Sequence, residues 1–294
     1  MLVTVDENSG FCWGVVRAID FAEQELKRNG KLYCLGEIIH NPIEIERLEK
    51  LGLVTITRED LPKVKDAKVL IRAHGEPPST YKIAEENSIT LIDATCPIVT
   101  KVQDRIKSFY EKGYQIIIFG KKEHPEVIGL NGVCENNAII IKTKEEIDTI
   151  DLKEKNVIFS QTTMDKSEFK VIVELINEKA KKSNSFHEIE VLVKDTICRS
   201  VSDREALLRS FSENNEVVLF VSGKSSSNGK VLFEICKKAN NNSYFIERAE
   251  EINEGWIDGK KSIGITGATS TPKWLMEEIK DFIINKKYKL KTAI

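Results

Sequence analysis

The sequence has no apolar run of the ~18 to 20 residues that a membrane-spanning helix needs. Its first ten residues also lack the basic segment and apolar core of a secretory signal. We therefore expect a cytoplasmic protein without a membrane partner, in a reducing compartment where disulfides are uncommon. The formal net charge is only −2, so we expect no nucleic-acid partner, and any anionic ligand must be bound by local groups.

Histidines are few, and the cysteines do not occur in closely spaced pairs. The 294 residues include four histidines and six cysteines. The cysteines form neither the paired C-x2-C pattern of compact zinc sites nor the C-x2-C-x2-C run of small ferredoxins. Cys34 lies in a strand pattern, Cys134 in a loop and Cys236 in a helical pattern, so we interpret these as small buried or incidental thiols. We interpret His187 as structural or solvated.

One stretch, in which a cysteine separates a strand from a helix, organises the chain. The apolar run 89–92 predicts a strand, and Pro97 opens an amphipathic helical pattern that Gly113 ends. Cys96 therefore lies at the N-terminus of that helix, because proline is favoured at the first helical position. The positive end of a helix dipole lowers a thiol pKa, so Cys96 is a candidate nucleophile or metal ligand.

The same arrangement occurs twice more. Cys12 follows the apolar run 2–5 and precedes a helical pattern, and Cys198 follows the run 189–193. Near the third cysteine, Ser202-Asp203-Arg204-Glu205 is typical of a capping box, which predicts a helix that begins several residues after Cys198. Three strand–cysteine–helix segments indicate an internal repeat.

The spacing of polar loops supports this repeat. A polar loop follows an apolar strand pattern 28 residues after each cysteine, at His40, His124 and Ser226. A second polar loop closes each segment 62, 66 or 72 residues after the cysteine, at His74, Thr162 and Ser270. Ligands bind beyond the carboxyl ends of parallel strands, and all of these positions are expected there.

These patterns predict an α/β fold with mostly parallel sheets. The three repeated units imply three-fold pseudo-symmetry, with the cysteines converging near its axis. The domains are expected to span residues 1–95, 96–195 and 196–285. The basic residues of 286–294 are expected to form a solvated tail.

The residue types indicate a metal cluster beside an anion site. Three thiolates around an iron–sulfur cube leave one iron without a protein ligand, and an open iron is a Lewis acid on which substrate can be reduced. Histidines near an anion can protonate and donate hydrogen bonds; the candidates are His40, His74 and His124. Hydroxyl and amide donors lie beside predicted helix N-termini, which favour phosphate; these are Ser226, Ser227, Asn228 and Ser270. Glu126 is the carboxylate near these histidines that can supply a proton.

Taken together, the motifs resemble the 4-hydroxy-3-methylbut-2-enyl diphosphate reductase family, which acts last in the methylerythritol phosphate route to isoprenoids. The resemblance covers nearly the whole chain. The motifs that carry it are Gly10-Phe11-Cys12-Trp13-Gly14-Val15, His40-Asn41-Pro42, Ala73-His74-Gly75, Asp93-Ala94-Thr95-Cys96-Pro97, His124-Pro125-Glu126, Gln161-Thr162-Thr163, Ser226-Ser227-Asn228 and Gly267-Ala268-Thr269-Ser270-Thr271-Pro272.

The resemblance implies an oxygen-sensitive [4Fe–4S] cluster on Cys12, Cys96 and Cys198, within three similar α/β domains in pseudo-three-fold arrangement around a central iron–sulfur cavity. It implies that the substrate diphosphate is held by His40, His74, Ser226, Ser227, Asn228 and Ser270. Thr162 and Glu126 would engage the substrate hydroxyl at the open iron, with Glu126 as proton source and His124 assisting. Two electrons from a ferredoxin or flavodoxin would remove that hydroxyl as water and give isopentenyl and dimethylallyl diphosphates. In one departure, Ser200-Val201 stands where the family commonly has Ala-Thr. We expect the loss of that threonine hydroxyl to weaken one contact and to remove none of the assigned ligands.

Two alternatives remain open at this stage. A three-cysteine cluster enzyme similar to quinolinate synthase would condense and dehydrate without net electron input, so dependence of turnover on a reductant separates it from a reductase. A non-catalytic iron–sulfur carrier or sensor would have no use for the histidine and serine loops, so tight diphosphate binding would argue against it.

Overall fold

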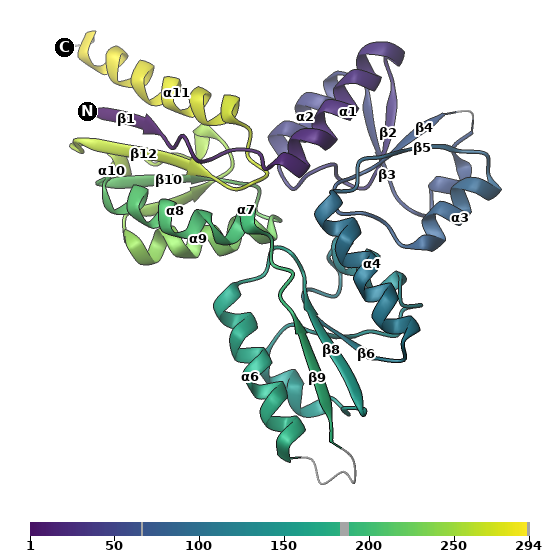
Figure 1. Cartoon of the computed structure of the whole chain (residues 1–294). Coiled ribbons are helices and arrows are strands. Elements are labelled where there is room, and N and C mark those ends of the chain that lie inside the picture. Colours follow the sequence, from purple (N-terminus) through teal and green to yellow (C-terminus); the bar gives the residue numbers. More distant parts are fainter. Residues whose placement is uncertain (66, 183–187, 293–294) are drawn as a thin grey trace. The chain divides into compact units, whose positions relative to one another are not determined.

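The computed structural model describes residues 1–65, 67–182 and 188–292, and the side chains of 286–292 are outside this description. The chain forms two compact units. The first unit comprises Met1–Ile19, Glu37–Leu53 and Arg199–Ile294, and the second comprises Asp20–Gly36 and Val54–Cys198. Three parallel four-stranded sheets alternate with helices along the chain (Figure 1), which confirms the predicted α/β class.

The sheet of the first unit has the strand order β1-β12-β10-β11. Its strands are β1 (Leu2–Val5), β10 (Val217–Val221), β11 (Ser243–Ile246) and β12 (Ser262–Gly267). The central strand β10 is apolar and buried throughout, as expected for a parallel strand covered on both faces. The helical segments of this unit are α2 (Pro42–Lys50), α7 (Arg199–Ser202), α8 (Arg204–Glu213), α9 (Ser227–Ala239), η3 (Ala249–Glu251), α10 (Glu254–Ile257) and α11 (Lys273–Thr292).

Alternate side chains of β10 face two different helical layers. Val217, Leu219 and Val221 belong to a core cluster with Leu275 and Ile279 of α11. The intervening residues of β10 pack in a second cluster with residues of α8 and α9. Figure 1 shows these helices on opposite faces of the sheet. Burial on both faces therefore fixes the register of β10, since a shift by one residue would exchange the two sets of side chains.

The second unit contains the other two sheets, with strand orders β3-β2-β4-β5 and β7-β6-β8-β9. Their strands are β2 (Leu32–Leu35), β3 (Leu53–Ile56), β4 (Lys68–Ile71), β5 (Thr90–Asp93), β6 (Gln115–Phe119), β7 (Ile139–Ile141), β8 (Lys155–Ser160) and β9 (Glu190–Lys194). Between them lie η1 (Leu61–Lys63), α3 (Pro78–Glu86), α4 (Pro97–Glu111), α5 (Pro125–Gly132), η2 (Lys144–Thr149) and α6 (Lys166–Lys182). The helix α1 (Trp13–Asn29) precedes β2.

Most predicted elements are confirmed, including the helix that begins at Pro97. Near the third cysteine, the predicted helix that begins several residues after Cys198 is confirmed by α8, which begins at Arg204, but the predicted capping box is wrong. The chain is already helical over Arg199–Ser202, and Asp203 precedes α8 without a side-chain capping bond. The short strands β3 and β11 were not predicted.

The first strand lies in a different sheet from β2 to β9, which follow it in the chain. β1 pairs with β12 from the end of the chain, in register from Leu2 opposite Ser262 to Val5 opposite Ile265. The proposed domain boundaries at 95, 195 and 285 stay a prediction, and the side chains of the basic segment 286–294 lie outside the described residues. None of the described helices combines the length and apolarity needed to span a membrane.

The parallel strands place the predicted loops at common sheet edges. In the first unit, β1 leads to Cys12, and β10 and β12 lead to Ser226 and Ser270. In the second unit, β4 and β5 lead to His74 and Cys96. The neighbouring strands β6, β8 and β9 lead to His124, Thr162 and Cys198. Candidate residues that are distant in sequence are therefore neighbours within each unit.

Candidate functional site

The predicted site residues form two groups, one in each unit. The first unit holds Cys12, His40, Ser226, Ser227, Asn228 and Ser270. The second unit holds His74, Cys96, His124, Glu126, Thr162 and Cys198. Each group is built from turns that connect a strand to the helix after it.

In the first unit, the turn after β12 connects Cys12 with Asn228. The backbone N–H of Cys12 donates to the carbonyl oxygen of Thr269 at 3.1 Å. The backbone N–H and the hydroxyl of Thr269 both donate to Asn228 Oδ1, at 2.9 and 2.8 Å. Asn228 Nδ2 is buried and has no hydrogen-bond partner among the described residues. A buried amide donor without a partner is costly, which suits a position that receives a ligand.

Serine hydroxyls surround the start of α9. Ser226 is the N-cap of this helix, and its hydroxyl accepts a hydrogen bond from the Gly229 N–H at 3.0 Å. The hydroxyls of Ser226 and Ser270 lie 3.4 Å apart, and both side chains are buried. Ser227 is buried beside them in the first turn. Hydroxyl, amide and helix N-terminal N–H groups thus meet at one place, an arrangement that can bind phosphate oxygens.

The loop that carries His40 packs directly on the loop after β10. A side chain at Gly223 would bring its Cβ within 2.3 Å of the His40 carbonyl oxygen, so only glycine permits this approach. Asn41 caps α2 by accepting from the Glu44 N–H at 3.1 Å. The buried Glu44 carboxylate in turn accepts from Trp274 Nε1 at 2.9 Å, which connects α2 to α11. His40 Nδ1 lies 3.3 Å from Glu37 Oε2.

In the second unit, Cys96 joins two candidate loops. It is the N-cap of α4, and its backbone N–H donates to the carbonyl oxygen of Ala73, next to His74, at 3.0 Å. Burial raises the pKa of the Cys96 thiol above its ordinary value, although the backbone N–H groups of Ile98 and Val99 lower it. The expected effect of the helix N-terminus is therefore present at Cys96, but desolvation outweighs it.

Thr162 connects Glu126 to Cys198. The backbone N–H of Thr162 donates to Glu126 Oε1 and its hydroxyl to Oε2, each at 2.7 Å. The Thr162 carbonyl oxygen accepts from the Cys198 N–H at 2.9 Å. Desolvation raises the pKa of the buried Glu126 carboxyl to about 6, even though both hydrogen bonds from Thr162 lower it. A carboxyl with this pKa can carry a proton near neutral pH and release it to a substrate.

His124 lies beside both Glu126 and His74. It is the N-cap of α5, and its Nδ1 accepts from the Glu126 backbone N–H at 3.2 Å. Because Nδ1 is an acceptor, a neutral His124 ring carries its proton on Nε2. The rings of His74 and His124 meet edge to face, with centroids 5.3 Å apart. Two imidazoles in contact can present donors to one anion.

The six cysteines divide into two kinds. Cys34, Cys134 and Cys236 are buried, and desolvation raises the pKa of Cys34 to about 12 and that of Cys236 to about 11. The prediction that these thiols are small buried residues is confirmed. The partly exposed set consists of Cys12, Cys96 and Cys198, and none of the six forms a disulfide. Accessible thiols at strand-to-helix turns fit thiolate ligation of a metal or an iron–sulfur cluster.

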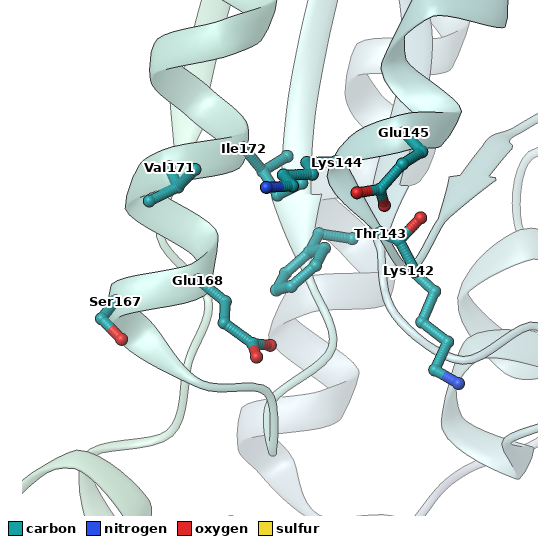
Figure 2. Close-up of a pocket in the computed structure, with 9 residues that line it drawn as sticks. Lys142, Thr143, Lys144, Glu145, Ser167, Glu168, Val171 and Ile172 are labelled. Atoms are coloured by element: carbon teal, nitrogen blue, oxygen red, sulfur yellow. The ribbon is translucent and has the colours of Figure 1, made fainter.

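A cavity of about 370 Å³ lies in the second unit between η2 and α6. Figure 2 shows Lys142, Glu145 and Glu168 at its rim, with Val171 and Ile172 on α6. Charges of both signs line it, and it contains none of the predicted site residues.

Two features of the site were not predicted from the sequence. The first is the role of Thr269, which belongs to one of the motifs given above. Its hydrogen bonds reach Asn228, 41 positions earlier in the chain, and Cys12, 257 positions earlier. The second is the burial of Val201, the residue of the departure noted above, in α7. The position of Thr269 at a strand end, next to Ser270, is the sequence signal that could have identified Thr269 as a site residue.

Comparison with known proteins gives consistent matches over almost the whole chain. A family model described as LytB protein matches residues 3–284. The 4-hydroxy-3-methylbut-2-enyl diphosphate reductase of Chloroherpeton thalassium is 50% identical over 303 residues, with 96% of each chain covered. The protein of the same name from Bacteroides fragilis is 50% identical over 287 residues, with 96% of this chain and 97% of that protein covered.

Solved structures of two reductases also match. The E-1-hydroxy-2-methyl-but-2-enyl-4-diphosphate reductase of Plasmodium falciparum has a TM-score of 0.84 at 28% identity, covering 95% of this chain and 87% of that one. A structure described as (E)-4-hydroxy-3-methyl-but-2-enyl diphosphate reductase, the terminal enzyme of the non-mevalonate pathway, has a TM-score of 0.71 at 36% identity. That match covers 97% of this chain and 100% of the other.

Proposed function

The chain belongs to the LytB protein family, and from this premise we propose that it reduces 4-hydroxy-3-methylbut-2-enyl diphosphate to isopentenyl and dimethylallyl diphosphates. The identity of the proposed substrate is taken from the names of the relatives described above. In the balanced reaction, two electrons and two protons replace the allylic C–O bond with a C–H bond and release the hydroxyl as water. The resemblance inferred from the motifs is confirmed at the level of the family and of an oxidoreductase.

The proposed cofactor is a [4Fe–4S] cluster held by Cys12, Cys96 and Cys198. Their partial exposure at strand-to-helix turns supports this choice over the three buried cysteines. Such a cluster, when bound, supplies electrons and one iron that the protein does not ligate. The three thiols would bind such a cluster as thiolates, because metal coordination removes the thiol proton, which burial favours at Cys96.

The observation that carries the proposed chemistry is the bond pattern at Glu126. Its carboxyl is buried, has a pKa of about 6, and is held by Thr162, whose carbonyl oxygen is bonded to the Cys198 N–H. A proton donor is thereby fixed beside a proposed cluster ligand. In our proposal Glu126 gives its proton to the leaving hydroxyl, Thr162 orients Glu126 and the hydroxyl, and His124 assists from the adjacent N-cap.

The diphosphate is proposed to bind the polar groups at the strand ends. In the first unit these are His40, Ser226, Ser227, Asn228 and Ser270, and the unpartnered Asn228 Nδ2 supports their assignment. In the second unit it is His74, whose ring lies edge to face against that of His124. Thr162 and His124 are proposed to contact the hydroxyl end of the substrate instead. A ferredoxin or flavodoxin as electron donor, and a cytoplasmic location, remain predictions.

One experiment tests the proposal as a whole. The protein is purified without oxygen, its iron and sulfide are measured, and Mössbauer spectra are recorded with and without the allylic diphosphate. We expect about four irons per chain, one of which changes its signal when the substrate is added. Turnover should depend strictly on a reductant. A metal-free protein, or turnover without any reductant, would overturn the proposal.

A further inference from the structure

The proposed function assigns no role to the side chain of Thr269. It is nearly buried, as is Asn228, and both of its hydrogen-bond donors converge on the same oxygen, Asn228 Oδ1. Asn228 lies in the first turn of α9, directly after Ser226 and Ser227. Thr269 lies directly before Ser270. The contact therefore joins the two polar loops that the first unit contributes to the diphosphate site.

The donors of Thr269 determine which way the Asn228 amide is turned. A backbone N–H can only donate a hydrogen bond, so the amide atom that faces it must be the oxygen. With Oδ1 committed to Thr269, the NH₂ group of Asn228 is directed to the opposite side. That NH₂ group is the buried donor without a partner among the described residues. The amide thus presents two N–H donors, and no acceptor, away from Thr269.

An anion requires this orientation. A flipped amide would turn Oδ1 toward the phosphate oxygens, and two acceptors would then repel each other. The backbone N–H of Thr269 already favours the correct orientation, and the hydroxyl strengthens it by about one neutral hydrogen bond. The carbonyl oxygen of Thr269 also accepts from the Cys12 N–H. A single residue therefore ties the donor amide to the turn that carries a proposed cluster ligand.

We infer that Thr269 is a positioning residue, which fixes the Asn228 amide with its N–H donors toward the substrate diphosphate. This inference rests on the proposed function, because it concerns the same diphosphate site. Thr269 itself does not touch the diphosphate in this proposal. It acts through Asn228, and its hydroxyl should affect binding rather than the chemical step.

The test first compares two substitutions of Thr269, to valine and to serine, in the cluster-loaded protein, handled without oxygen. Thr269→Val keeps the shape of the side chain and removes the hydroxyl. We expect Thr269→Val to raise the Kd of the allylic diphosphate, and its KM, about 3- to 10-fold, as for the loss of one neutral hydrogen bond. The kcat should change by less than about twofold, because the chemistry is untouched. Thr269→Ser restores a hydroxyl and should recover most of the affinity.

A double-mutant cycle shows whether the effect passes through Asn228. Asn228→Ala removes the donor, and adding Thr269→Val to it should have no further effect on Kd. Asn228→Asp keeps the acceptor for Thr269 but replaces the donor with a charged oxygen, so it should weaken binding on the order of 100-fold or more. Affinity is measured by calorimetry, and thermal unfolding confirms that each variant is folded. Thr149→Val, at the exposed end of η2, is a matched control that should bind as the unmodified protein does.

The outcomes separate this inference from the proposed function. If the unmodified protein binds the diphosphate and Asn228→Ala weakens binding while Thr269→Val does not, the role of Thr269 is wrong and the proposed function stands. Independent, multiplying effects of the two substitutions would also contradict it. If the unmodified protein does not bind the diphosphate, the proposed function fails and this inference fails with it.

Discussion

Thr162 donates two hydrogen bonds of 2.7 Å to the carboxylate of Glu126, one from its backbone and one from its hydroxyl. Both bonds favour the ionised carboxylate, yet burial is the larger effect and raises the pKa to about 6. The balance leaves Glu126 partly protonated near neutral pH. The carboxyl is therefore a usable acid whose position is fixed in advance, which is what protonation of a leaving hydroxyl requires.

Glu126→Gln should bind substrate and barely turn it over. Glutamine can keep both contacts, because its oxygen accepts from the Thr162 N–H and its NH₂ donates to the Thr162 hydroxyl oxygen. It cannot release a proton, so we expect kcat to fall roughly 10²- to 10⁴-fold. Steady-state kinetics and calorimetry measure this. Glu123→Gln, at an exposed neighbour, is the control, and wild-type rates in Glu126→Gln would exclude the proton role.

The rate should depend on pH through the same group. The acid form of Glu126 is required, so kcat should fall as pH rises through its pKa of about 6. The residual activity of Glu126→Gln should lack this decline. A pH profile of kcat from about 5 to 8, with saturating reductant, measures both. An identical decline in the two proteins would assign it to another group.

Stability should change with pH in the same direction. The folded state holds the Glu126 proton more tightly than the unfolded chain does, because burial raises the pKa from 4.5 to about 6. The contribution of Glu126 to the free energy of unfolding is therefore greatest below about pH 4.5. This contribution is lost as pH rises through about 6, and the free energy of unfolding changes on the order of 2 kcal/mol. Denaturant unfolding of the cluster-free protein should show a smaller loss over this interval in Glu126→Gln. Equal losses in both proteins would contradict the assignment.

Cys96→Ser should lose most of its cluster iron. A serine hydroxyl is a weaker ligand than a thiolate, and Cys96 is one of three proposed ligands. Iron and sulfide analysis of protein purified without oxygen measures the loss. Cys34→Ala replaces a buried thiol with a raised pKa and should retain the unmodified iron content. A full cluster in Cys96→Ser would remove this cysteine from the ligand set.

His74→Ala should mainly weaken diphosphate binding. The His74 ring packs edge to face on His124, and its loss removes one charge-assisted donor, so we expect Kd to rise about 10- to 100-fold with a smaller change in kcat. Lys142→Ala removes a cation at the cavity of Figure 2 and is the control. Unchanged affinity in His74→Ala would place the diphosphate elsewhere.

The sequence predicted much of the fold and most candidate residues, because reactive side chains at strand ends leave a local signal. Cys96 could be placed at a helix N-terminus from Pro97 alone, and the structure agrees. The predicted lowering of its thiol pKa is wrong in net direction, since desolvation depends on residues that the fold brings around Cys96, and it outweighs the helix N-terminus. The pairing of β1 with β12 and the hydrogen bonds of Thr269 could not be predicted from the sequence either. Both join segments far apart in the chain, and no local pattern encodes such contacts.

Thr162→Val should move the pH profile without removing the acid. The Thr162 hydroxyl lowers the pKa of Glu126, and valine deletes that bond while the backbone N–H bond remains. The carboxyl should therefore hold its proton to higher pH, so the decline in kcat should shift upward. Infrared absorption of the protonated carboxyl, compared with Glu126→Gln, reports this titration independently of turnover. Substrate affinity should also weaken, because the proposed contact of the hydroxyl with the substrate is lost. A titration that is unchanged or shifted downward would mean that the hydroxyl of Thr162 does not control the proton on Glu126.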